Sequence, residues 1–99
     1  MDRLEIIHRL KGAEAALRAT GVESLMLFGS HARGDASEGS DIDLYAEGQG
    51  GGHLNLISIT KGQTAIQALF PGKAVSYSSR DSISPIYLPY IEAGSIRVF

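Results

Sequence analysis

The chain has 99 residues, a formal net charge of −2 at pH 7 and no cysteine. At this length, residues 1–99 are expected to form a single domain, with a modest core and no separate acceptor-binding domain. The composition argues against disulfides and thiolate metal sites, against a general nucleic-acid binder, which carries a strong basic footprint, and against a membrane span, because no apolar run is long enough.

The segment Met1–Leu10 is rich in charged residues, which argues against a signal peptide, so a cytoplasmic location is expected. This segment opens a predicted helix from about Asp2 to Thr20, which Gly21 is placed to end. The uninterrupted apolar run that follows predicts a buried strand over Glu23–Phe28. Along one face of the predicted helix, apolar residues repeat at Ile6, Leu10, Ala13 and Leu17.

Gly29 ends this strand, and Ser30 begins a predicted short helix through Arg33. Glycine permits a tight turn and a close approach of the backbone to a ligand. The free N–H groups of a helix start and the positive end of its dipole favour an anion such as phosphate, and the Ser30 hydroxyl adds a donor. The sequence leaves two uses open for Arg33, one helical turn from Ser30: contact with phosphate, or an ion pair with Asp35 or Asp41.

Ten residues separate Gly29-Ser30 from a pair of aspartates, Asp41 and Asp43, in a predicted strand over Asp41–Glu47. Two carboxylates about 7 Å apart along a strand repel each other unless a cation lies between them, and hard oxygen ligands suit Mg²⁺ or Mn²⁺. Gly-Ser turns and Asp-x-Asp pairs are each common at surfaces, but their combination indicates a site for a metal-chelated nucleoside triphosphate. Alternation along the strand directs Asp41, Asp43 and Tyr45 to one face and Ile42 and Leu44 to the other.

The rest of the chain predicts a loop, a helix, a third strand and a terminal helix before a short tail. In that order, their ranges are Gly48–Gly52, Leu54–Leu69, Lys73–Ser79, Pro85–Ala93 and Ile96–Phe99.

Histidine and tyrosine side chains are weaker candidates for a functional role. No two histidines have the spacing of metal ligands, so His8, His31 and His53 are expected at the surface. Three tyrosines could stack on an adenine or contact a partner, but half-buried core positions at the boundary of sheet and helix are favoured. They are Tyr77, Tyr87 and Tyr90.

Two segments, Phe28–Asp35 and Ser40–Leu44, resemble the signature of the minimal nucleotidyltransferases, small relatives of the DNA polymerase beta superfamily. The order of the predicted elements extends this resemblance over nearly all of the chain. It implies an α/β (α+β) class and the polymerase-beta-like nucleotidyltransferase fold, in which a small mixed sheet carries helices mainly on one face.

The resemblance also implies roles for the turn and the acidic pair. Gly29 and Ser30 would hold the triphosphate, Asp41 and Asp43 would bind Mg²⁺, and Ser30 with the two aspartates would form the catalytic set. Members of this family usually transfer a nucleoside monophosphate from ATP to an acceptor hydroxyl. Many are encoded beside a ribonuclease toxin of the HEPN class and act as its antitoxin, in some cases by adenylylating a tyrosine of the toxin.

One position departs from the family pattern. The family commonly carries a third carboxylate on the later strand, after a Gly-Lys or Gly-Arg pair, whereas here Gly72-Lys73 leads to Ser76. A serine hydroxyl is not a carboxylate base, and the downstream acids Asp81 and Glu92 are predicted in a loop and on a helix surface. Two functions stay open: transfer of AMP from Mg-ATP to a hydroxyl of a partner protein, or an antitoxin-like module that masks a partner with little or no catalysis. A third possibility, a purely structural domain with an empty site, is the least favoured because the signature is intact.

Overall fold

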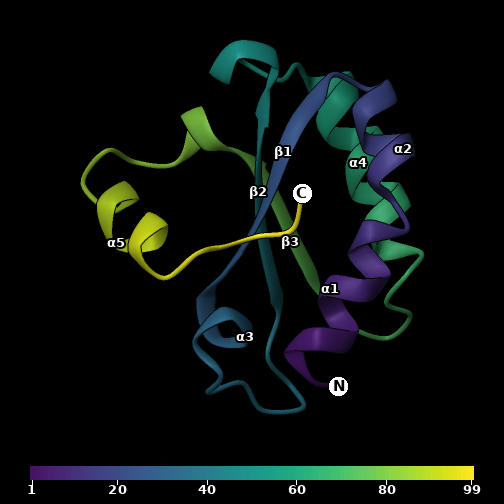
Figure 1. The fold of residues 1–99 in the computed structure, drawn as a ribbon, viewed down its shortest axis with the longest axis vertical. Helices are drawn as coiled ribbons and strands as arrows, with labels where there is room; N and C mark the ends of the chain where they lie inside the picture. The colour runs from purple at the N-terminus through teal and green to yellow at the C-terminus, as the bar shows by residue number, and fades with distance from the viewer.

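The computed structural model describes all residues from 1 to 99 and shows a four-stranded sheet in the order β3-β2-β1-β4 (Figure 1). Strand β1 runs antiparallel to both of its neighbours, whereas β2 and β3 are parallel, so the sheet is mixed as predicted. The strands span Val22–Phe28 (β1), Ile42–Gly48 (β2), Val75–Ser79 (β3) and Ile96–Arg97 (β4).

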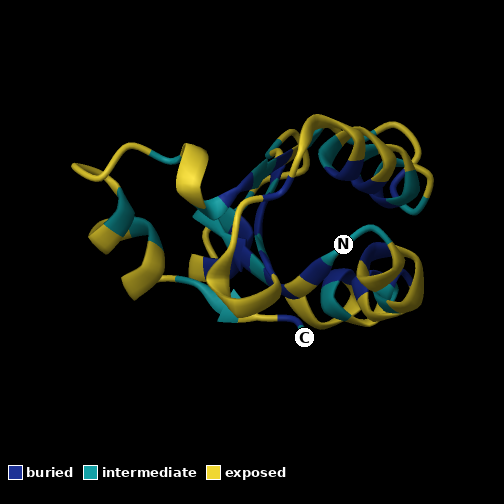
Figure 2. Ribbon diagram, turned by 90° about the horizontal axis from the view of Figure 1, so that it is seen from above, coloured by how far each residue is buried: buried dark blue, intermediate teal, exposed yellow.

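Helices α1, α2 and α4 cover one face of the sheet, while α5 lies on the opposite side (Figure 2), which agrees with the prediction that helices pack mainly on one face. No helix has both the length and the apolar character that crossing a bilayer requires. The helices span Arg3–Lys11 (α1), Glu14–Ala19 (α2), Gly29–Arg33 (α3), Leu56–Gln67 (α4) and Leu88–Ala93 (α5), and short 3-10 turns occupy Gln49–Gly51 and Arg80–Ser82.

The core lies between the sheet and this helical layer. Leu25 and Leu27 of β1 pair with Ala46 and Leu44 of β2, and all four side chains are buried against the helices. Complete burial of a leucine stabilises the fold by roughly 1.5–3 kcal/mol, so these residues hold the two central strands in a defined register. Other fully buried core residues are Ile6, Leu10, Leu17, Ile42 and Ile66.

The single helix predicted over Asp2–Thr20 is wrong, because the structure breaks it into α1 and α2 at Gly12 and Ala13. Asp2 caps α1 as predicted, and its Oδ1 accepts a hydrogen bond of 2.8 Å from the Glu5 N–H. The backbone N–H of Gly12 closes the helix on the Arg9 and Leu10 carbonyls. Glycine is a poor helix former, and the break lets both short helices bury their apolar faces against the sheet.

Helix α4 runs without a break through Gly62, although glycine weakens a helix interior. A Cβ at Gly62 would overlap the ring of Tyr77, so the absent side chain lets α4 pack directly on β3. Tyr77 is therefore a core residue, as favoured from the sequence. Its hydroxyl has no hydrogen-bond partner, and burial raises the pKa of Tyr77 to about 12.

The C-terminal region differs most from the prediction. The terminal helix begins at Leu88 rather than at Pro85, and Pro89 occupies its first turn, where proline is tolerated. The predicted tail forms the edge strand β4, in which Ile96 pairs with Leu27. The Val98 N–H also donates to the Leu25 carbonyl at 2.8 Å.

Candidate active site

The turn after β1 lies directly against one of the predicted metal ligands. Gly29 has a φ of +74°, and a Cβ at this position would overlap the Oδ2 atom of Asp43. The two residues meet because Phe28, the last residue of β1, pairs with Asp43 in the antiparallel ladder. Only glycine combines this backbone conformation with this approach, so the structure brings the Gly-Ser turn and the acidic pair together.

The first N–H groups of α3 have no side-chain cap, because the residue before Gly29 is Phe28. The Ser30 carbonyl closes the short helix by accepting hydrogen bonds from Gly34 and Asp35, at 3.0 and 3.1 Å. The helix has a single turn, so its dipole is small, and the useful donors are the individual N–H groups of the turn. Uncapped donors beside two carboxylates suit a phosphate group that a cation bridges to those carboxylates.

Asp41 is exposed and lies just before β2, which begins at Ile42 rather than at Asp41 as predicted, whereas Asp43 is half-buried on the face of the sheet away from the helical layer. Burial raises the pKa of Asp43, and the negative charge of Asp41 raises it further, while His31 and Arg33 act in the opposite direction. A divalent cation would relieve this repulsion. Mg²⁺ is commonly held by one or two carboxylates together with substrate phosphates, so Asp41 and Asp43 fit this group.

Ser76 occupies the position beside Asp43 where the third carboxylate was expected. Strand β3 pairs in parallel with β2 in a register that matches Asp43 with Ser76, so both side chains project from the same face. No three His, Cys, Asp or Glu side chains form a cluster that could hold a metal ion. The register confirms the predicted placement of Ser76 and leaves the acidic pair without a third carboxylate.

The two downstream acids form contacts elsewhere. Asp81 lies 2.6 Å from the exposed His53 ring, and it also accepts a hydrogen bond from Ser79. Glu92 of α5 accepts a hydrogen bond of 3.1 Å from Arg80. Neither acid therefore replaces the missing carboxylate beside Asp43.

A sequence profile of the nucleotidyltransferase domain matches residues 10–63, which is more than half of the chain and includes the turn and the acidic pair. The chain belongs to this nucleotidyltransferase family. Among curated proteins, no sequence matches it significantly.

Solved structures support the same fold for this nucleotidyltransferase domain. A candidate minimal nucleotidyltransferase is 26% identical and superposes with a TM-score of 0.79, over 97% of this chain and 95% of the other. A toxin–antitoxin structure with AMP-PNP reaches a TM-score of 0.73 at 17% identity, over 94% and 72% of the two chains. A mutant of the toxin–antitoxin pair MntA-HpeT reaches 0.68 at 15% identity, over 100% and 73%.

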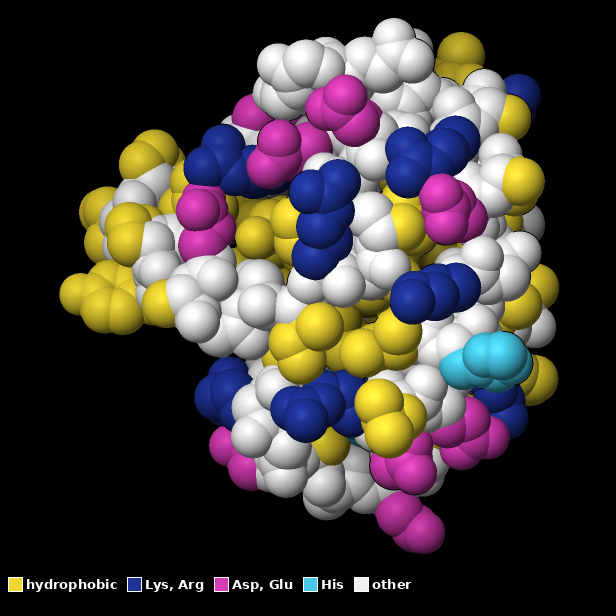
Figure 3. Space-filling model, viewed as in Figure 1, with side chains coloured by type: hydrophobic (Ala, Val, Ile, Leu, Met, Phe, Trp, Pro, Cys, Tyr) yellow, Lys and Arg dark blue, Asp and Glu magenta, His cyan; other side chains and the backbone are white.

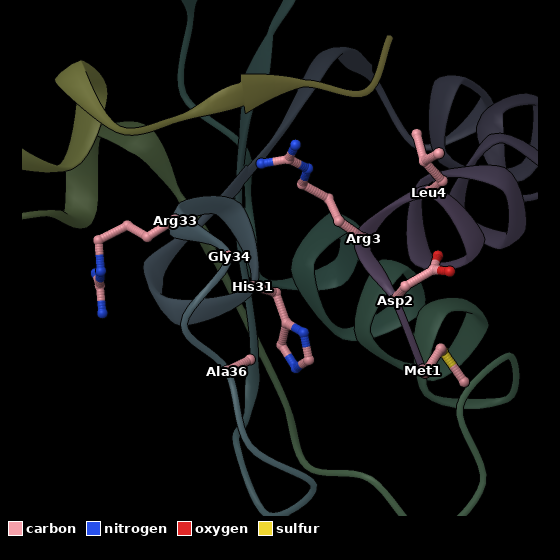
Figure 4. A pocket seen from close by; sticks show the side chains of 8 residues that line it. All are labelled: Met1, Asp2, Arg3, Leu4, His31, Arg33, Gly34 and Ala36. Carbon is pink, nitrogen blue, oxygen red and sulfur yellow. The ribbon is translucent and has the colours of Figure 1, made fainter.

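The two functional candidates on α3 of the nucleotidyltransferase domain point in different directions (Figure 4). Arg33 extends away from α1 and forms an exposed ion pair with Asp35, 3.1 Å between Nε and Oδ2. The sequence left two uses open for Arg33, and the structure shows the ion pair with Asp35. An exposed ion pair of this kind is weak enough for a phosphate to displace.

The prediction that His31 is exposed is wrong. Only 4% of the residue is exposed, its ring points toward the start of α1 (Figure 4), and its Nε2 has no hydrogen-bond partner. Helix α3 packs on β1 and β2, and its Ala32 carbonyl accepts a hydrogen bond of 3.0 Å from Arg3 Nη1 of α1. A five-residue helix is too short to show a periodic pattern, so the sequence carried no signal for this burial.

A cavity of about 280 Å³ adjoins the turn on the other side of α3. Helix α5 supplies one wall through Tyr90 and Ile91, and the turn supplies Gly29. Tyr90 and Tyr87 are 80% and 64% exposed, so their predicted half-buried core positions are wrong. The sequence named Tyr90 as a residue that could stack on an adenine, but nothing local indicates that it lines a cavity together with Gly29.

Proposed function

We propose that the protein binds a magnesium-chelated nucleoside triphosphate, most simply ATP, and transfers the nucleoside monophosphate to a hydroxyl of a partner protein. The observation that carries this proposal is the contact between Gly29 and Asp43. It places uncapped turn N–H groups beside the carboxylates, which is the arrangement that nucleotidyl transfer needs.

Each residue of the site has a distinct role in this proposal. Gly29 and Ser30 bind the terminal phosphates and hold the pyrophosphate as it leaves. Asp41 and Asp43 would hold the Mg²⁺, which would supply positive charge beside the transferring phosphoryl group. Arg33 leaves its exposed pair with Asp35 to contact a phosphate, where a guanidinium binds two oxygens at once.

An antitoxin-like binding module is the second candidate function, and the specific observation in its favour is Ser76 beside Asp43. Without a carboxylate there, activation of the acceptor hydroxyl depends on a group from the partner. The sequence resemblance suggests a HEPN-type toxin as that partner, and two structures of similar fold are toxin–antitoxin assemblies. In this alternative the protein masks its partner and transfers nucleotide slowly or not at all.

Calorimetric titration with ATP, with and without Mg²⁺, tests the first step of the proposal. Heat of binding should require Mg²⁺, and the double variant Asp41→Asn with Asp43→Asn should abolish it. A matched control with Glu23→Gln and Glu38→Gln removes two exposed acids outside the site and should bind as the wild type does. Equal heats for the wild type and the Asp41/Asp43 double variant would contradict the proposal.

Transfer of label from ATP to the product of the neighbouring gene separates the enzyme from the binding module. A missing general base slows transfer by about 10²–10⁴-fold, so Ser76→Asp should raise the labelling rate substantially. Ser78→Asp is the matched control, because Ser78 lies on the same face of β3 but pairs with Tyr45 rather than with Asp43. Rapid labelling by the wild type that Ser76→Asp leaves unchanged would show that the base lies elsewhere.

A further inference from the structure

We infer that the cavity between α3 and α5 holds the nucleoside of the bound triphosphate, and that Tyr90 stacks on a purine base there. This inference rests on the proposed function and extends it. The turn and the acidic pair bind only the phosphates and the metal, and the inference assigns a binding surface to the nucleoside.

The position of the cavity is the first support. Its wall includes Gly29 and Arg33, which are also proposed phosphate ligands, so the cavity is continuous with the phosphate site. Figure 1 shows α5 to the left of the sheet and α3 at the lower end of β1, and the outline in Figure 3 is indented between the projecting α5 lobe and the lower part of the molecule. A nucleotide with its phosphates at Gly29 can therefore place its nucleoside in this indentation.

A larger cavity of about 540 Å³ lies on the opposite side of α3, beside His31 and the start of α1 (Figure 4). It does not include Gly29, and no aromatic ring other than the His31 imidazole lines it. The buried Nε2 of His31 lacks a partner, but the side chain points away from the turn. The smaller cavity is the better match for a base, because it joins the phosphate site and contains aromatic side chains.

Tyr90 is the second support. Tyr90 is 80% exposed and is one of the residues that line the cavity, so its ring is not committed to the core. Every nucleobase has a flat π-face on which such a ring can stack, and removal of one stacking ring weakens binding by about 5- to 100-fold. Tyr87 projects from the same segment with 64% exposure but does not line the cavity.

The chemistry of the lining residues decides the class of base. Only Arg33 and Tyr90 carry polar side-chain groups among the lining residues, and Arg33 is assigned to phosphate. The cavity can hold a base by stacking but offers few groups that read its hydrogen-bonding edge. ATP and GTP should therefore bind with similar affinity, and CTP should bind more weakly because a pyrimidine offers a smaller ring face.

Calorimetry with Mg-ATP and with Mg-tripolyphosphate, which lacks a nucleoside, tests the inference. Tyr90→Ala should weaken Mg-ATP by about 5- to 100-fold and change Mg-tripolyphosphate by less than about twofold. Tyr90→Phe keeps the ring and should bind Mg-ATP as the wild type does. Tyr87→Ala is the matched control and should bind both ligands normally, and melting temperatures of all variants verify that they are folded.

Four results would overturn the inference: normal Mg-ATP binding by Tyr90→Ala, an equal loss of both ligands in that variant, the same loss in Tyr87→Ala, or an affinity for ATP more than about tenfold above that for GTP. Failure of the proposed function looks different. In that case the wild type binds neither Mg-ATP nor Mg-tripolyphosphate, and the inference fails with it. Binding of Mg-tripolyphosphate without any effect of Tyr90→Ala would refute the inference alone.

Discussion

The two faces of the β-sheet differ in what lies on them: the helical layer buries one face and the candidate site lies on the other, and strand β2 shows this difference within a few residues. Ile42 and Leu44 point into the helical layer and are completely buried. Asp43, which lies between them, projects from the opposite face beside Gly29 and Ser76. The helical layer covers Ile42 and Leu44 but not Asp43. Substitutions around Asp43 should therefore alter ligand binding without unfolding the domain.

The face with the site is itself partly covered. Tyr45 is buried there through an edge-to-face contact with Phe28, whose ring centroid lies 5.6 Å away. Phe28 is the residue before the turn, so this aromatic pair holds the end of β1 against β2. Part of this second face thus supports the position of Gly29 rather than contributing to chemistry.

The largest expected effect is on the helix-covered face. Leu44→Ala should lower the free energy of unfolding by about 2–5 kcal/mol, because it removes buried methyl groups and leaves a cavity. Ser76→Ala on the neighbouring strand should change it by less than about 0.5 kcal/mol, since Ser76 is exposed. Urea unfolding followed by circular dichroism measures both. Similar losses in the two variants would break the division between the faces.

A pair of glycine variants gives the next largest effect. Gly29→Ala and Gly34→Ala both place a Cβ on a residue with positive φ, which costs roughly 1–2 kcal/mol in each case. Only at Gly29 does the new atom overlap Asp43, while the space around Gly34 is open. We therefore expect similar losses of stability in urea but loss of Mg-ATP binding in Gly29→Ala alone. Normal binding by Gly29→Ala would mean that the contact with Asp43 is not needed.

A smaller effect concerns the charge on the site face. Burial and the charge of Asp41 raise the pKa of Asp43 in the folded protein, so ionisation of Asp43 opposes folding. The neutral, protonated form of Asp43 is therefore the one that favours the folded protein. Its contribution to stability is fully present below the ordinary Asp pKa of 3.8 and is lost as the pH rises through the raised pKa. Asp43→Asn should therefore melt like the wild type in acid but at a higher temperature at neutral pH, with EDTA present.

Glu38→Gln, which neutralises an exposed acid in the segment before β2, is the control for that experiment and should not show the same dependence on pH. A marked fall in the melting temperature of Asp43→Asn at neutral pH would indicate that the carboxylate is a structural hydrogen-bond acceptor.

The smallest expected change in the free energy of unfolding is at Tyr77, on the helix-covered face. Tyr77→Phe removes a buried hydroxyl that has no hydrogen-bond partner, so it should leave stability unchanged or raise it by up to about 1 kcal/mol. Tyr77→Leu also removes the ring that packs on Gly62 and should lower stability. Urea unfolding of both variants measures the difference. A clear loss in Tyr77→Phe would show that the hydroxyl is hydrogen-bonded in solution.

Short-range patterns in the sequence were enough to predict the parts of the site that depend on near neighbours. The apolar run before Gly29 indicated β1, and alternation along β2 placed the side chain of Asp43 on the other face of the sheet from that of Leu44. These assignments hold because a strand directs successive side chains to opposite faces whatever packs on it. The position of Ser76 beside Asp43 also followed, once β3 was assumed to pair with β2.

Only the tertiary structure decided the features that depend on partners far away in the chain. The break at Gly12, the burial of His31 and the pairing of Ile96 with Leu27 each require a surface that another element supplies. The same is true of Tyr90, which lines one cavity with Gly29 although the two residues lie far apart in the chain. The local sequence therefore determined which residues are proposed to bind phosphate and metal, whereas the packing of distant elements determined what else surrounds them.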